Sequence, residues 1–192
     1  FSEPVTQNTK RYVRTFWGLD RALAYGRHFP SINWLTSYSE YIADLKPWYD
    51  QQVSPRFMAD RQRIFTLLQE EDQLLEIVKL IGADVLPEEQ KLTLETARLI
   101  RVGFLQQNAY NQIDTYVPLE KQFQMMEVIL ALYDGAKPLL ERAIPLSQIK
   151  ATGIFASLSK IKYEVPNDTP QRFEGYHEAI RAALRQVDEA NR

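Results

Sequence analysis

The stretch FWGLDRALAYGRHFPSINWLTSYSEY, residues 16–41, decides how the chain is organised, because it concentrates aromatic residues and turn formers. The aromatic and β-branched residues from Tyr12 to Trp17 lead into it and predict a short strand that Gly18 ends. Residues 2–9, rich in Ser, Thr, Asn and Pro, predict a loop before this strand. A single strand cannot satisfy its own backbone groups, so we expect its partner strands to lie outside this chain.

The middle of this stretch predicts a stiff corner around Phe29. Asp20 is a suitable N-cap for a short helix that runs through Ala24. Pro30 ends that helix, because proline forces Phe29 out of the helical region. The corner therefore holds an aromatic ring at a fixed angle, and we expect His28 to orient it by hydrogen bonding rather than to transfer a proton.

From Ser37 onwards, apolar residues recur at spacings of three and four, which predicts a bundle of helices. Pro47 and Pro138 fall inside helical patterns, where we expect them to bend or break the helix. Helix starts are expected at prolines and a left-handed stop at a glycine, namely Pro55, Pro87, Pro145 and Gly82.

The helix that starts at Pro87 is expected to run towards Leu105, and residues 114–118 predict a turn. Beyond Pro145, we expect one helix, and after a break at residues 166–170 a last helix from about residue 171 to 191. The expected apolar face of the helix after Pro145 consists of Ile149, Ile154, Leu158 and Ile161.

Composition excludes several classes of protein. The chain has 192 residues, 45% hydrophobic and 25% charged, which is ordinary for a globular domain with one core. A net charge of −2 provides no basic stripe for nucleic acid. The absence of cysteine excludes disulfides and thiol chemistry and fits a reducing, cytoplasmic setting. No apolar run approaches the ~20 residues of a membrane span, so we expect no direct membrane insertion.

The sequence also lacks motifs for independent phosphate or metal chemistry. No GxxxxGK[ST] occurs, so no loop of this kind can cradle phosphates, and we expect the chain alone not to hydrolyse ATP. His28 and His177 are the only histidines and there is no HExxH, so we expect no metal site. We expect His177 to lie on a solvated helix face. Glu70, Glu71 and Asp72 could suggest paired carboxylates, but we interpret them as an exposed run of charge.

Three long motifs carry a family resemblance. They are FSEPVTQNT at residues 1–9, the FWGLD and GRHFPSINW segments within residues 16–34, and LTLETARLIRVGFLQQNAYNQIDTY at residues 92–116. In this order and spacing they resemble the catalytic A subunit of V-type and archaeal-type rotary ATPases over residues 1–130 approximately. Because Phe1 opens a motif that the family carries well inside its length, we expect the carboxy-terminal part of a larger subunit.

The resemblance implies a fold with two parts. Residues 1–35 would complete the edge of a nucleotide-binding α/β domain, and residues 36–192 would form a helical bundle domain. The expected fold class is mainly α, with a C-terminal helical bundle preceded by a short α/β remnant. Without the rest of that α/β domain, we expect the first segment to be poorly supported or rearranged.

The resemblance also implies that Phe29 and Pro30 lie beside the adenine of a bound nucleotide. A rigidly held aromatic ring can stack on the base and exclude water. The alternative is that Phe29 fills the core beneath the helical bundle.

A second part of the adenine wall is expected at Gln107, Asn108, Ala109 and Tyr110. Helix ends expose polar groups that can meet the edge of a base, Ala109 is small enough to let a ring approach, and Tyr110 could cover the other face. The alternative is a polar helix exit with Tyr110 packed inward. The family usually has phenylalanine in place of Tyr110, and an acidic pair in place of Val102 and Gly103. The second departure puts local helix stability in doubt.

The third candidate site is the acidic turn GADVLPEEQ at residues 82–90, which resembles the tip that meets the central shaft in rotary ATPases. Weak charge contacts with a basic coiled coil could slide as the shaft turns. The alternative is an ordinary solvated turn. The residues expected to contact the shaft are Asp84, Leu86, Pro87, Glu88 and Glu89.

Together, these features predict the carboxy-terminal domain of a catalytic A subunit that couples ATP hydrolysis or synthesis to shaft rotation and ion transport. The partners that the resemblance implies are the B subunits of an A3B3 ring and a central shaft subunit, in a cytoplasmic sector peripheral to the membrane. It implies ATP or ADP and Mg in the intact subunit, with no cofactor expected in this chain alone. The competing hypothesis is a non-catalytic helical adaptor whose grooves hold partner helices.

Overall fold

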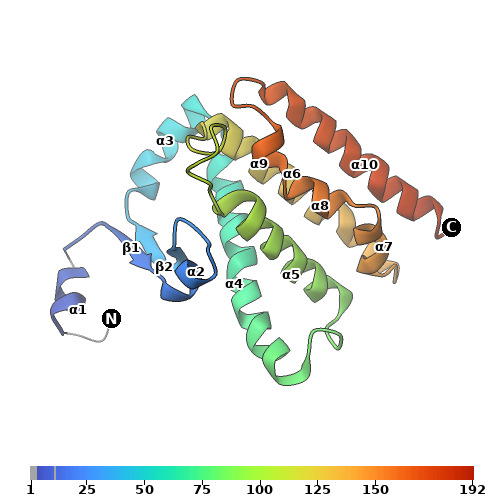
Figure 1. Cartoon of the computed structure of the whole chain (residues 1–192), viewed down its shortest axis with the longest axis horizontal. Coiled ribbons are helices and arrows are strands. Elements are labelled where there is room, and N and C mark those ends of the chain that lie inside the picture. Colours follow the sequence, from blue (N-terminus) through green and yellow to red (C-terminus); the bar gives the residue numbers. More distant parts are fainter. Residues whose placement is uncertain (1–3, 11) are drawn as a thin grey trace. The chain divides into compact units, whose positions relative to one another are not determined.

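The computed structural model describes residues 4–10 and 12–192 (Figure 1). The fold is mainly α, with a small sheet near its start and a set of helices after it, as the sequence predicts. The chain divides into two compact units, Phe1–Met58 and Ala59–Arg192. The domain edge expected near residue 35 concerns the intact subunit, so it stays a prediction.

The first unit contains a two-stranded antiparallel sheet, so the expectation that the first strand finds no partner within this chain is wrong. Its two strands consist of the segments rich in β-branched and aromatic residues that lie before and after the corner at Phe29. Its elements are helix α1 Pro4–Lys10, strand β1 Thr15–Leu19, helix α2 Arg21–Tyr25, strand β2 Ile32–Ser39 and helix α3 Ile42–Gln52.

Three boundaries in this unit differ from the sequence predictions. Residues 4–10 form a helix rather than a loop, with Pro4 in the first turn, where a proline needs no backbone N–H. The helical region begins at Ile42 rather than at Ser37, because residues 32–39 pair with β1. Pro47 lies inside α3 without ending it.

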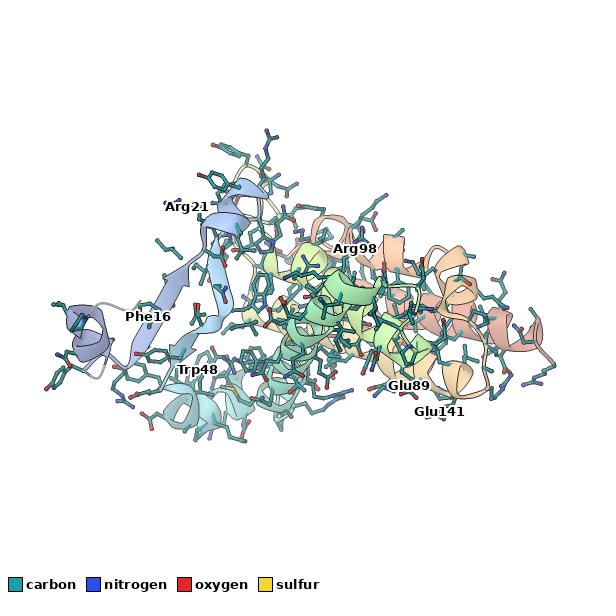
Figure 2. The ribbon with its side chains drawn as sticks, turned by 90° about the horizontal axis from the view of Figure 1, so that it is seen from below. Phe16, Arg21, Trp48, Glu89, Arg98 and Glu141 are labelled. Carbon is teal, nitrogen blue, oxygen red and sulfur yellow. The ribbon has the colours of Figure 1, made fainter. Side chains whose placement is uncertain are left out.

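The sheet continues past Gly18 because a bulge accommodates this glycine. A side chain there would place its Cβ 2.4 Å from Thr36 Oγ1. The Gly18 N–H donates to Ser37 Oγ at 3.0 Å, and the Ser37 hydroxyl donates to the Asn33 carbonyl at 2.5 Å. Phe16 on β1, labelled in Figure 2, stacks on Tyr38 of β2, and their ring centroids are 5.9 Å apart. The glycine thus allows close approach within the strand instead of ending it.

The second unit is a helical bundle built around α6. Helices α5 and α10 both pack against α6, and α10 runs alongside it (Figure 1). Its helices are α4 Phe57–Ile81, which starts before the division, α5 Glu88–Ile100, the π-helix Arg101–Leu105, α6 Leu119–Glu141, α7 Leu146–Ala151, α8 Ile154–Leu158, α9 Ile161–Glu164, the 3-10 helix Pro170–Arg172 and α10 Phe173–Glu189.

Most helix ends in the second unit fall where the sequence predicts. Gly82 follows α4 with a φ of 84°, the left-handed stop that only glycine adopts without strain. Pro138 does not split α6, which continues to Glu141. The single helix expected after Pro145 is three short helices, α7 to α9, with Gly153 at a φ of 82° between the first two. The four apolar residues expected on its inner face are all buried: Ile149, Ile154, Leu158 and Ile161.

Candidate functional site

The loop that follows the π-helix carries one predicted segment of the site. The helix from Glu88 continues through Arg101–Leu105 as a π-helix, a wider turn that is often found at functional sites. The chain then leaves helical geometry at Gln106 and re-enters it at Leu119. Residues 106–118, named here the exit loop, therefore include all four predicted residues from Gln107 to Tyr110.

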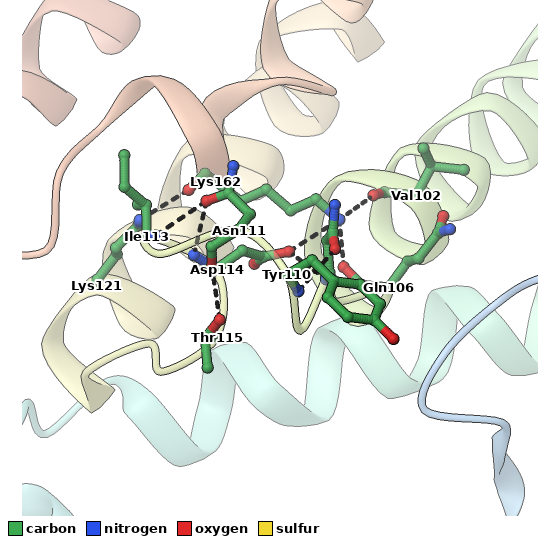
Figure 3. A network of polar contacts seen from close by, with 10 residues as sticks. Val102, Gln106, Tyr110, Asn111, Ile113, Asp114, Thr115, Lys121 and Lys162 are labelled. Carbon is green, nitrogen blue, oxygen red and sulfur yellow. Dashed lines mark hydrogen bonds and ion pairs between the residues drawn. The ribbon is translucent and has the colours of Figure 1, made fainter.

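Short-range hydrogen bonds shape the exit loop (Figure 3). The Asn108 side chain accepts from the Tyr110 N–H at 3.0 Å, and Asp114 Oδ2 accepts from the Asn108 N–H at 2.6 Å. The Thr115 hydroxyl contacts the Ala109 carbonyl at 2.9 Å and the Asn111 carbonyl at 2.7 Å. Asn and Thr side chains that bond nearby backbone groups form compact turns, so the backbone of this loop has a defined shape.

The predicted residues of the exit loop are all exposed. Tyr110 is 100% exposed, so the alternative in which its ring packs inward is wrong. Gln107 lines a hollow of about 240 Å³ together with buried Asp114 and apolar side chains. An exposed ring can stack on a planar ligand, and a partly polar hollow can offer hydrogen bonds to the edge of a ligand. The apolar and amide side chains of this lining are Phe104, Leu105, Val117, Gln122 and Met125.

Beneath the exit loop lie two buried lysines that the sequence analysis missed. Lys121 of α6 and Lys162 of α9 are each 2% exposed. Lys162 Nζ donates to the carbonyls of Val102, at 2.9 Å, and Gln106, and it lies 3.9 Å from Asp114 Oδ2. Burial lowers the pKa of both lysines, and Asp114 opposes this shift. The sequence could have indicated that Lys121 is buried, because it falls four residues before buried Met125 and therefore lies on the same inner face of α6.

The corner that carries Phe29 and Pro30 belongs to the first unit, and its helix is capped by Asp20 as the sequence predicts. Helix α2 ends at Tyr25 with Gly26 as C-cap, so the expectation that Pro30 ends this helix is wrong. Asp20 caps α2 by accepting from the N–H groups of Ala22 and Leu23 at 2.7 and 3.3 Å. It also accepts from Asn33 Nδ2 at 2.8 Å, and this bond is the main reason that the pKa of Asp20 lies below its usual range.

Backbone hydrogen bonds close the corner. The Asp20 N–H donates to the Ser31 carbonyl at 2.9 Å, and the His28 N–H donates to the Leu23 carbonyl at 2.9 Å. The His28 ring lies against Trp34 with ring centroids 5.5 Å apart. The Phe29–Pro30 peptide is cis, and Phe29 is 53% exposed. A half-exposed ring is available to a ligand and does not fill the core of the first unit. The alternative, in which Phe29 fills the core beneath the helical bundle, stays a prediction.

The acidic turn between α4 and α5 divides into exposed and engaged residues. Asp84, Pro87 and Glu89 are exposed, whereas Leu86 is 5% exposed. Glu88 is half-buried, because Glu88 Oε2 accepts from the Leu146 N–H at 2.7 Å and Oε1 accepts from Lys91 Nζ at 2.9 Å. The hydrogen bond from Lys91 is the main cause that lowers the pKa of Glu88.

One part of the acidic run at residues 70–72 is not exposed, which corrects the sequence interpretation. Glu71 is 4% exposed and holds Arg101, whose Nε lies 3.1 Å from both carboxylate oxygens and whose Nη2 lies 2.9 Å from Oε1. The pair joins α4 to the first residue of the π-helix. Burial raises the pKa of Glu71, and Arg101 opposes this shift.

These arrangements suit binding and positioning. In the part of the chain that the structure describes, no group of three or more His, Asp or Glu side chains is arranged to hold a metal ion. None of the helices within residues 4–10 and 12–192 is long and apolar enough to cross a membrane. The exit loop and the corner offer exposed rings, amides and backbone groups on well-connected turns.

Comparison with known proteins gives a consistent result. A family model for the C-terminal domain of V and A type ATP synthase matches residues 46–150. The V-type ATP synthase alpha chain of Halothermothrix orenii is 51% identical over 174 residues, which cover 91% of this chain and 30% of that protein. The V-type ATP synthase alpha chain 2 of Clostridium tetani is 54% identical over 168 residues, 88% of this chain and 28% of that protein. The A subunit of the A-type ATP synthase of Methanosarcina acetivorans is 46% identical over 184 residues, 96% of this chain and 31% of that protein.

This chain therefore spans less than a third of the length of these curated relatives. Since the family model covers more than half of its residues, the chain belongs to the family of the C-terminal domain of V- and A-type ATP synthases.

Proposed function

We propose that this chain is the carboxy-terminal domain of the catalytic A subunit of a V-type ATP synthase or ATPase. In that role it forms the adenine-side wall of the nucleotide site and the lever that couples ATP hydrolysis or synthesis to shaft rotation and ion transport. Family membership supports the assignment to this type of subunit. The observation that carries the adenine wall is the fully exposed Tyr110 ring on an exit loop whose backbone is tied by Asp114 and Thr115.

The base would be bound by stacking and by edge contacts. Tyr110 and Phe29 each present an exposed ring, and Pro30 belongs to the same corner as Phe29. Gln107 and Asn108 supply amide groups at the exit of the π-helix, and the small side chain of Ala109 would let a ring approach. Phe29 lies in the first unit and Tyr110 in the second, and their meeting at one nucleotide stays a prediction.

The test replaces Tyr110 and Phe29 singly with alanine and measures the dissociation constant of the full-length subunit for ATP. Loss of one stacked ring should weaken binding about fivefold, and Tyr110→Phe should bind as the wild type does, because the ring is retained. Tyr116→Ala is a matched control, since Tyr116 is an exposed tyrosine of the same loop. Unchanged ATP affinity in both alanine variants would remove the adenine wall from the proposal.

The lever would be the α4–α5 hairpin, with the acidic turn as its contact with the central shaft. Asp84, Pro87 and Glu89 supply the exposed surface of this contact. Glu88 holds the turn in place by accepting a hydrogen bond from the Leu146 N–H, and Leu86 holds it by its burial. Exposed charge contacts are individually weak, which suits a surface that must slide along a rotating partner.

The test of the lever reverses the exposed charges in the assembled complex. The double variant Asp84→Lys with Glu89→Lys should reduce ATP-driven ion transport more than ATP hydrolysis, because it disturbs coupling and leaves the nucleotide site intact. Glu178→Lys on the exposed face of α10 is the matched control. Equal loss of transport and hydrolysis in the double variant would argue against a coupling role for the turn.

The remaining roles concern the intact enzyme. ATP or ADP and Mg would be bound mainly by the part of the subunit that precedes this chain, with an arginine from a neighbouring B subunit, so we expect the isolated chain not to hydrolyse ATP. B subunits of the A3B3 ring and a central shaft subunit would be its partners. Its place would be the cytoplasmic catalytic sector, peripheral to the membrane. Family membership favours this role over a free-standing helical adaptor.

A further inference from the structure

The exit loop is anchored from below by two ammonium groups. Lys162 Nζ donates to the carbonyls of Val102, the second residue of the π-helix, and of Gln106, the first residue after it (Figure 3). These carbonyls stand at a helix end, where the backbone has no helical N–H left to bind. A cation at this end is also favoured by the helix dipole. The start of the exit loop is therefore fixed by Lys162.

Lys121 fixes the far end of the same loop through a neighbouring asparagine. Its Nζ donates to the carbonyls of Lys162 at 2.9 Å and Val165 at 2.7 Å, and to Asn167 Oδ1 at 3.0 Å. Asn167 Nδ2 in turn donates to the carbonyls of Ile113 at 3.0 Å and Tyr116 at 2.7 Å. One continuous set of bonds thus joins α6, α9 and both ends of the exit loop.

The third contact fixes the middle of the loop. Asp114, which is 1% exposed, accepts from the Asn108 N–H at 2.6 Å and lies 3.9 Å from Lys162 Nζ. Its charge offsets part of the cost of burying Lys162 beneath the loop. The segment from Gln107 to Tyr110 is thus the exposed part of a loop whose buried side is held by the contacts of Asp114, Lys121 and Lys162.

Each buried lysine has a cost and a gain. An apolar side chain of similar length would avoid the desolvation cost of an ammonium group but would leave the carbonyls that the lysine binds without this donor. A buried lysine also fixes the groups that it binds relative to one another, since all three donors of Lys121 are satisfied by groups at defined places. A site that must hold a ring at a fixed angle benefits from that rigidity.

We propose that Lys162 and Lys121 are positioning residues that hold the Gln107–Tyr110 turn in the geometry that receives the nucleotide base. This inference rests on the proposed function, because it takes the turn to bind the base. The two lysines themselves do not touch the base. Lys162 acts on the start of the exit loop, before the turn, and Lys121 acts through Asn167 on the part of the loop that follows the turn.

The experiment uses the full-length subunit with Lys162→Met, Lys121→Met and, as matched control, Lys160→Met, which removes an exposed lysine two residues away. In the assembled enzyme, both buried-lysine variants should raise the KM for ATP about fivefold while kcat changes less than twofold, because the phosphates are bound elsewhere. Amide hydrogen exchange over residues 106–116 should become faster in both, and Lys160→Met should match the wild type in every readout.

A purely structural role predicts a different result. It would lower the thermal unfolding midpoint of the variants and leave both the KM and the exchange rates of the folded protein unchanged, which would overturn the inference. If neither variant folds, amide hydrogen exchange of the wild-type protein is the test. The N–H groups of Asn108 and Tyr110 must then exchange far more slowly than those of an open loop. Fast exchange at these two positions would equally overturn it.

Tyr110→Ala separates this inference from the proposed function. If Tyr110→Ala and Phe29→Ala both leave ATP affinity unchanged, the adenine wall itself fails. If Tyr110→Ala weakens ATP binding while Lys162→Met leaves the KM and the exchange rates unchanged, only the positioning role fails.

Discussion

At the scale of single residues, similar side chains of the acidic turn have different surroundings. Glu88 and Glu89 are neighbours in the sequence, and both suit the first turn of α5. Only Glu88 reaches another element, because its carboxylate accepts from the Leu146 N–H at the start of α7. Sequence spacing could not separate the two, since the contact joins positions 58 residues apart.

We expect Glu88→Ala to destabilise the second unit by about 1–2 kcal/mol, because the Leu146 N–H loses a charged acceptor. Urea unfolding followed by far-UV circular dichroism measures this change. Glu89→Ala is the control and should fall within about 0.5 kcal/mol of the wild type, since Glu89 is exposed. Equal effects from both substitutions would show that the Leu146 contact contributes nothing to stability.

Tyr176 provides a prediction for alkaline pH. Burial, assisted by its hydrogen bond to Glu164 at 2.6 Å, raises the pKa of Tyr176 to about 12. In the unfolded chain this phenol loses its proton near pH ~10. Between these two values the folded state binds more protons than the unfolded state, so stability should fall as the pH rises from about 10 towards 12.

The Tyr176→Phe variant should therefore lose stability less steeply than the wild type over this range. Urea midpoints measured at several pH values from 8 to about 11 give the two slopes. Burial also raises the pKa of Tyr163, so Tyr163→Phe should reduce the loss of stability with pH in the same direction. Parallel curves for Tyr176→Phe and the wild type would contradict the assigned shift.

At the scale of elements, the π-helix Arg101–Leu105 is held at both ends. Glu71 of α4 binds Arg101, its first residue, and Lys162 of α9 binds the carbonyls of Val102, its second residue, and of Gln106, the residue after its end. The helix-forming pattern predicted the continuation towards Leu105. It did not predict the wider turn, which coincides with these two charged contacts from other helices.

We expect Glu71→Ala to destabilise the second unit by about 2–3 kcal/mol, because it leaves Arg101 without its bidentate partner in a partly buried place. Glu70→Ala, one residue earlier and exposed, is the control. A double-mutant cycle with Arg101→Met, based on urea unfolding, isolates the pair. Strict additivity of the two single effects would rule out a direct contribution of the ion pair.

At the scale of the whole molecule, the two units differ in how much apolar surface they bury. Among the described residues, Phe57 is the only buried apolar side chain of the first unit, and all the others belong to the second unit. Trp17, Leu19 and Tyr25 of the first unit are largely exposed. Burial of apolar surface is the main source of stability, so the first unit should be the less stable part of this chain.

This difference can be measured directly, because Trp17, Trp34 and Trp48, the three tryptophans of the chain, all lie in the first unit. In urea, the tryptophan fluorescence transition should occur at a lower concentration than the transition in far-UV circular dichroism, which the helices of the second unit dominate. Fast amide exchange in β1 should accompany it. Coincident transitions with a fully protected β1 would instead favour a self-sufficient adaptor.

The sequence by itself determined the helical class of the second unit, the cap at Asp20, the stop at Gly82 and the inner face formed by Ile149, Ile154, Leu158 and Ile161. These features depend on local backbone preferences and on periodicity, which operate over a few residues and are therefore visible in a single chain. The motifs at Phe29 and at Gln107–Tyr110 likewise indicated the family.

Only the tertiary structure decided which polar groups are buried and what they hold. The pairing of β1 with β2, the contact between Glu71 and Arg101, and the placement of Lys121 and Lys162 under the exit loop all join residues distant in sequence. The free energy of a buried charge depends on the partners that folding brings to it, and sequence spacing carries no information about those partners.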